Sequence, residues 1–194
     1  MIYLILIGLA MLVIATAVAI GYGANFFLVF AFVCLATVMV VAVDGVTAAV
    51  CRALPKAWVS ERHAVFKVSA KEKNFYEKIG VRKWKDKIPE LGHMTGFRKN
   101  KLGDTNSLEY LERFLLENRY GEVGHVASCL TSFLILLAYP LTPLWLAISI
   151  PVAVVSMLMN IPSLFILRYT SYKLEFLRKS LLKKQQKTVE KQIA

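Results

Sequence analysis

Hydrophobic residues fill two long stretches of the chain that carry no formal charge. Residues 1–43 and 123–167 contain no Lys, Arg, Asp or Glu. Because a helix needs about 20 apolar residues to cross the hydrocarbon core of a bilayer, each stretch has room for two spans. Turn residues divide each stretch, at Gly21–Asn25 and at Tyr139–Pro143. The predicted spans are Met1–Ile20, Phe26 to about Cys51, about Val123–Ala138, and Leu144–Leu167.

This pattern predicts an all-α membrane protein with four transmembrane helices in two hairpins. The predicted divisions are a first transmembrane hairpin (1–51), an interfacial segment (52–122), a second hairpin (123–167) and a basic tail (168–194). An even number of spans places both termini and the interfacial segment on the same side. That side is expected to be the cytoplasm, because short loops rich in Lys and Arg remain there. We therefore expect a multi-pass protein of the cell membrane.

Composition and charge support this prediction and exclude other classes. The chain has 194 residues, 57% of them hydrophobic, and a formal net charge of +11. Sixteen of the 24 Lys and Arg lie in residues 52–122 and eight in residues 168–194. Basic residues confined to segments beside apolar spans indicate membrane orientation and anionic lipid contact, so no nucleic-acid partner is expected. The three cysteines lack paired spacing and are expected to be reduced packing residues.

The interfacial segment interleaves aromatic and basic residues. Between Lys71 and Ile88 this alternation is typical of a helix lying in the membrane plane, with lysines reaching the headgroups. Farther along, Asn106 and Glu109 have the spacing of a capping box that starts another helix. Membrane lipids are therefore expected partners of this segment.

Candidate chemistry gathers at the expected cytoplasmic ends of the spans. Glu122 and His125 are three positions apart and share a helix face, so the carboxylate could orient the imidazole as a general base. Asp44 lies 18 residues after Phe26, about 27 Å along its helix. Asn160 lies 17 residues after Pro143, at a similar depth of about 25 Å. These polar groups could therefore meet at one site.

Simpler interpretations of the same residues remain open. His125 could be a histidine at a helix entry that the headgroups solvate. Asp44 could pair with Arg52 or a nearby Lys, and Asn160 could satisfy backbone groups freed by Pro162.

A second Glu-x-x-His motif, at Glu90 and His93, raises the possibility of a di-iron membrane oxidase. Di-iron ligands require rigid facing helices, whereas this motif follows Pro89 and lies among glycines. We therefore expect no metal site and no bound cofactor.

Several of these segments together resemble the glycosyl-4,4'-diaponeurosporenoate acyltransferases of the staphyloxanthin type. The similarity extends from about Trp58 to Tyr172. It rests on the run from Asn74 to Pro89, the Glu117–His125 helix, and Asn160-x-Pro162 with Arg168-Tyr169. The resemblance implies a small integral membrane enzyme that esterifies a sugar hydroxyl of a glycosylated carotenoid with a fatty acyl chain.

The resemblance also implies roles for individual residues. His125 would be the base, with Glu122 and Glu117 as orienting carboxylates. The resemblance further implies substrate-binding roles for Trp84, Lys85, Asn160 and Arg168. Asp44 and Arg119, which the resemblance does not carry, are also expected to bind substrate, because they lie near the cytoplasmic ends of their helices. The acyl donor would be acyl-CoA, acyl carrier protein or an acyl lipid, attracted by basic residues such as Arg82, Lys83, Arg98, Lys99 and Lys101. The acceptor would be a lipid or glycolipid.

A non-enzymatic alternative belongs to a different class. In a lipid-binding or scaffold subunit, the Trp- and Lys-rich segment would bind headgroups and His125 would only pack.

Overall fold

The computed structural model describes residues 2–88 and 105–193. Every regular element within these ranges is helical. Four helices among them are long and apolar enough to cross a membrane: Leu4–Tyr22, Phe26–Arg52, Leu108–Ala138 and Pro143–Lys187. The predicted all-α membrane fold class is thereby confirmed.

The chain divides into two compact units. Unit 1 comprises Met1–Ala53 and Val123–Leu164, and unit 2 comprises Leu54–Glu122 and Phe165–Ala194. Two long helices contribute residues to both units. These are α5 (Leu108–Thr131) and α6 (Pro143–Ile193).

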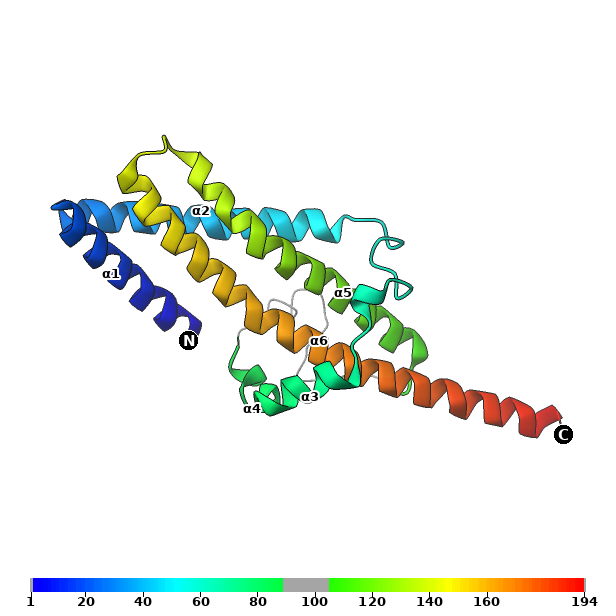
Figure 1. Cartoon of the computed structure of the whole chain (residues 1–194). Coiled ribbons are helices and arrows are strands. Elements are labelled where there is room, and N and C mark those ends of the chain that lie inside the picture. The colour runs from blue at the N-terminus through cyan, green and yellow to red at the C-terminus, as the bar shows by residue number, and fades with distance from the viewer. Residues whose placement is uncertain (1, 89–104, 194) are drawn as a thin grey trace. The chain divides into compact units, whose positions relative to one another are not determined.

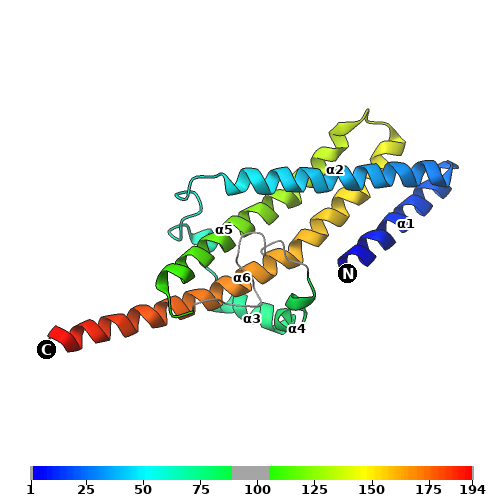
Figure 2. The ribbon, with the colours of Figure 1, turned by 180° about the vertical axis from the view of Figure 1, so that it is seen from behind.

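In unit 1, α1 (Ile2–Tyr22) and α2 (Phe26–Arg52) form a helical hairpin (Figures 1 and 2). Gly23 makes the turn possible because its φ of 59° lies in the left-handed region that side chains disfavour. The Asn25 side chain then caps α2 by accepting a hydrogen bond from the Leu28 N–H at 3.2 Å. The turn residues in the sequence therefore lie between the first two spans, as expected.

The second half of unit 1 is another hairpin. After α5 the chain tightens into the 3-10 helix η4 (Ser132–Ala138), and α6 starts at Pro143. The Tyr22 hydroxyl donates to the Pro143 carbonyl at 3.1 Å, which places the turn of the first hairpin beside the start of α6. Small and branched residues of α1, α2, η4 and α6 form the core of this unit, including Ala15, Val33, Ile135 and Val152.

Most large apolar side chains on α1 and α2 that lie outside this core are exposed. Leu4, Val13, Ile20, Phe27 and Val38 are each at least 66% exposed. A surface of this kind suits lipid tails, because burial against hydrocarbon replaces burial in a protein core.

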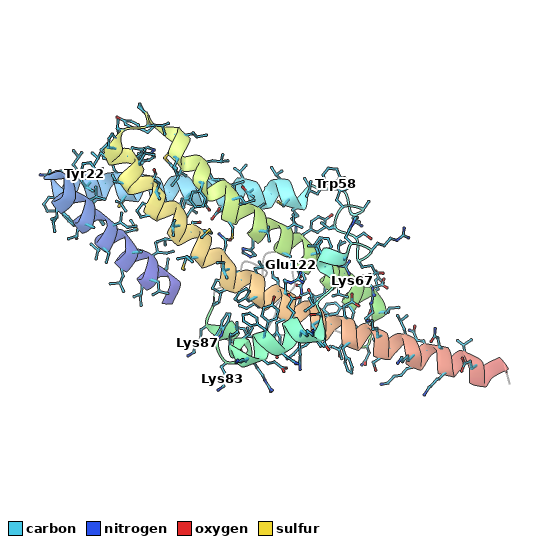
Figure 3. The ribbon with its side chains drawn as sticks, in the orientation of Figure 1. Tyr22, Trp58, Lys67, Lys83, Lys87 and Glu122 are labelled. Carbon is cyan, nitrogen blue, oxygen red and sulfur yellow. The ribbon has the colours of Figure 1, made fainter. Side chains whose placement is uncertain are left out.

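Unit 2 contains the interfacial segment. Its short helices are η1 (Ala64–Phe66), α3 (Ala70–Lys78), α4 (Val81–Trp84) and η2 (Lys85–Lys87). The expectation of one helix over Lys71–Ile88 is wrong, because Gly80 has a φ of 70° and separates α3 from α4. Tyr76, Val81, Ile166 and Tyr169 form a small buried core, while Lys83 and Lys87 point outward (Figure 3).

Two helices also differ from the boundaries expected from the sequence. The expected third span and the helix before it are one continuous α5, which starts at Leu108 and is capped by Ser107, whose hydroxyl accepts from the Tyr110 N–H at 3.2 Å. The helix α6 continues beyond Leu167 to Ile193 because the Lys-, Leu- and Gln-rich tail consists of good helix formers. Pro151 and Pro162 lie within α6 without ending it.

Candidate active site

Unit 1 contains a cavity of about 230 Å³ between α1, α2, α5 and α6. Polar side chains gather toward one part of it: Asp44, His125, Ser156, Asn160 and Ser163. The rest of the wall is almost entirely apolar and includes four residues of α1: Ile7, Ala10, Met11 and Ile14. The cavity therefore joins a small polar group to a larger apolar space.

Asp44 accepts hydrogen bonds from two other polar residues that line this cavity. Its Oδ2 accepts from the Ser156 hydroxyl at 2.9 Å and from the Asn160 amide nitrogen at 3.4 Å. The Ser132 hydroxyl lies 3.3 Å from Oδ1. Charged side chains inside membrane spans are rare unless polar groups compensate them. These neighbours explain how a carboxylate is accommodated in α2.

The side chain of Asn160 connects Asp44 to His125. Its amide nitrogen donates to Asp44 and, at 3.1 Å, to the Ser156 carbonyl. Since both of these neighbours are acceptors, the amide oxygen must face His125, and it lies 2.7 Å from Nδ1 of the ring. In the neutral imidazole Nδ1 then carries the proton, and Nε2 is left with the lone pair. This is the tautomer that a general base requires at Nε2.

A second polar cluster lies in unit 2, where α3, α5 and α6 contribute side chains. Arg168 donates from Nε and Nη2 to Glu72, and from Nη1 to Glu122 at 3.1 Å and to the Val65 carbonyl at 2.8 Å. Glu122 also accepts from the Ser171 hydroxyl at 3.0 Å and is only 3% exposed. We infer that Arg168 holds this unit together, because each of its nitrogens already has a partner within the protein.

The carboxylate of Glu72 is bound on both sides. Arg168 lowers the pKa of Glu72 below its usual value, and the Tyr76 hydroxyl, which donates to the carboxylate at 2.5 Å, acts in the same direction. The pKa of Tyr76 is raised by burial and by this negatively charged neighbour. Glu72 is therefore ionised, and Tyr76 protonated, near neutral pH.

The pairing expected between Glu122 and His125 is replaced by other partners. Glu122 bonds to Arg168 and Ser171, whereas His125 bonds to Asn160. The carboxylate that reaches His125 through Asn160 is Asp44. Glu117 is partly exposed and lies five residues before Glu122, which turns it about 140° around the helix axis from that residue. Glu117 and Glu122 therefore lie on different sides of α5.

The other expected binding residues are engaged within unit 2. Arg119 lies 3.6 Å from Glu61 and 3.5 Å from Glu175 in ion pairs, and its side chain is 10% exposed. The indole nitrogen of Trp84 donates to the Ile79 carbonyl at 3.1 Å, and its ring packs on the small core around Tyr76. Lys85 lies 3.7 Å from Asp86.

Some expected residues lie outside the described part of the chain. They include Glu90 and His93 of the second motif, Pro89, and the basic residues Arg98, Lys99 and Lys101. Within residues 2–88 and 105–193, no three His, Cys, Asp or Glu side chains gather as a metal site would require.

Sequence reasoning missed several residues that complete these clusters. Ser156 is four positions before Asn160, and Glu72 is four before Tyr76, so each pair shares one helix face. That spacing could have indicated from the sequence that the members of each pair lie side by side. The partners on other helices, Ser132 for Asp44 and Ser171 for Glu122, had no local signal because 88 and 49 residues separate them in the chain.

Together, the fold and the site define a polytopic helical membrane protein with an acid–amide–imidazole chain facing an apolar cavity. The family model of the glycosyl-4,4'-diaponeurosporenoate acyltransferases matches residues 55–180, more than half of the chain. The protein belongs to this family. Its membership and its span-length helices support a membrane acyltransferase connected with carotenoid biosynthesis. The searches of curated proteins and of solved structures gave no match.

Proposed function

We propose that this protein transfers a fatty acyl group to a hydroxyl of a lipid or glycolipid, with His125 as the general base. The observation that carries the proposal is the chain of hydrogen bonds from Asp44 through Asn160 to Nδ1 of His125. This chain leaves Nε2 as the basic nitrogen, in a residue that lines the cavity. Membership in an acyltransferase family supports the reaction class.

The proposed step needs no covalent enzyme intermediate. The acceptor hydroxyl oxygen attacks the acyl carbonyl carbon, forming a new C–O bond as the bond from that carbon to the donor's carrier breaks. Nε2 of His125 takes the hydroxyl proton and then gives it to the leaving group. Asp44, acting through Asn160, stabilises the charged imidazolium that forms between the two transfers.

The substrates follow from the family. Its name implies an acyl donor and a glycosylated acceptor. We propose that the donor is acyl-CoA, acyl carrier protein or an acyl lipid. Trp84 and Lys85 would shape a surface of unit 2 that attracts the acyl donor, beside the exposed Lys83 and Lys87. Because the side chains of Trp84 and Lys85 are already bonded within this unit, they suit shaping the surface that substrates meet more than taking part in acyl transfer.

We place the reaction at the cytoplasmic face of the cell membrane. All Lys and Arg lie in residues 52–122 and 168–194. The turn residues of the two hairpins carry no charge. Because positively charged loops stay in the cytoplasm, both termini and the interfacial segment would be cytoplasmic.

Reporter fusions test this orientation. Alkaline phosphatase, which is active only outside the cytoplasm, is expected to be active when fused after Ala24 in the first turn. The same enzyme fused after Arg62 or after Ala194 is expected to be inactive. Activity at Arg62 would overturn the proposed face, and inactive fusions at all three points, with the protein in the membrane, would contradict the first hairpin.

Lipid mass spectrometry tests the reaction itself. In cells that make glycosyl-4,4'-diaponeurosporenoate, expression of this protein is expected to produce its fatty acyl ester, because the glycosyl hydroxyls are the acceptors that the family name implies. Cells with an empty vector provide the control. Equal ester levels in the two cultures, with the protein present in the membrane, would contradict the proposal.

A further inference from the structure

The apolar part of the cavity is built largely by the first hairpin. Ile7, Ala10, Met11 and Ile14 line it from α1, and Val40 and Val41 from α2. Val152, Val155 and Met159 of α6 complete the wall. This hairpin precedes residue 55, where the family match begins.

Helix positions show that the cavity extends from the polar residues toward the turns of the hairpins. On α6 the lining residues run back from Asn160 to Val152, about 12 Å along the helix. On α2 they run back from Asp44 to Thr37, about 10 Å. Both directions lead toward the end where Tyr22 bonds to Pro143. The cavity is therefore an apolar space with His125, Asp44 and Asn160 toward one end.

We propose that this cavity binds the fatty acyl chain that is transferred, and that α1 forms the wall that selects its length. The inference rests on the proposed function. A sugar needs hydrogen-bonding partners, which are concentrated at the polar end, whereas a saturated chain needs only apolar contact. An acyl carbonyl placed near Nε2 of His125 would direct its alkyl chain into the apolar part.

Ala10 and Met11 are the residues that should set the chain length. Ala10 has the smallest side chain among the α1 lining residues, so a larger residue there would fill the cavity. Met11 is partly buried against the core and lines the same space, so its truncation would enlarge the cavity. The selectivity would then lie in the first hairpin, outside residues 55–180 of the family match.

The test uses cells that make glycosyl-4,4'-diaponeurosporenoate, express the full chain and receive a mixture of saturated fatty acids of graded length. Ala10→Leu is expected to shift the ester products toward shorter chains, and Met11→Ala toward longer ones. A methylene difference in an apolar pocket changes selectivity about tenfold or more, so the ratio of long to short esters should move by at least that factor. Ala17→Leu is the matched control, because Ala17 is exposed on the same helix.

The outcomes separate this inference from the proposed function. Opposite shifts for Ala10→Leu and Met11→Ala, with the wild-type distribution in Ala17→Leu, would support the acyl-chain site. Unchanged distributions in both cavity variants, with ester still formed, would overturn the site and leave the acyltransferase proposal standing. If one variant fails to accumulate in the membrane, the chain-length distribution of the esters formed by the other variant decides between these two outcomes. Absence of ester in the wild type would overturn both.

Discussion

Replacing His125 with alanine is expected to lower the initial rate of ester formation by about 10²–10⁴-fold, the usual contribution of a general base. The reason is local: Asn160 orients the ring so that Nε2 can accept a proton, and alanine supplies no such atom. The substitution also leaves the amide oxygen of Asn160 without its ring partner. The rate must therefore be compared at equal amounts of folded protein in the membrane.

His63→Ala provides a matched control for this prediction. His63 is exposed, and its Nε2 lies 3.1 Å from the Ala57 carbonyl. The control is expected to keep the wild-type rate. If His125→Ala also kept that rate, His125 would be a packing residue and the base would have to be sought elsewhere.

Replacing Arg168 with methionine is expected to destabilise the protein by about 3–5 kcal/mol, the usual effect of removing one partner from a buried ion pair. Methionine retains much of the side-chain bulk but leaves Glu72 and Glu122 facing each other without the guanidinium. The Glu122 side chain is 4% exposed, so solvent cannot replace the lost partner. A fall in the midpoint of thermal unfolding of the purified protein in detergent measures this effect.

Lys179→Met is the control for Arg168→Met, because it removes one positive charge from an exposed position on the same helix. Its unfolding midpoint is expected to remain close to wild type. Equal midpoints for Arg168→Met and the wild type would contradict the structural role of the Arg168 cluster.

Much of the fold could be predicted because the membrane imposes a simple length rule. Two charge-free stretches and their turn residues were enough to predict four span-length helices in the described part of the chain. The break at Gly80 was not predicted, because the alternation of aromatic and basic residues continues through it. The last predicted span ends at Leu167, whereas α6 continues to Ile193, because a loss of hydrophobicity at Arg168 marks a change of environment and not the end of a helix.

The polar site was only partly predictable. Distances along helices placed Asp44 and Asn160 at one depth, and the structure joins them by a hydrogen bond. The partner of Glu122 could not be predicted in the same way. Glu122 and His125 share a helix face, but Ser171 and Arg168 of another helix bond to the carboxylate. Which of these residues bonds to the carboxylate depends on how the helices pack, and spacing along one helix carries no information about that packing.

The most direct test of the account uses the purified protein in liposomes that contain glycosyl-4,4'-diaponeurosporenoate, with acyl-CoA, acyl carrier protein thioesters and acyl lipids supplied as donors. Without other proteins, a scaffold subunit cannot form product, whereas an acyltransferase can. We predict that the wild type forms the acyl ester at a rate about 10²–10⁴-fold above that of His125→Ala. Ester formation at equal rates by the two proteins, or none by the folded wild type with any donor, would contradict the account.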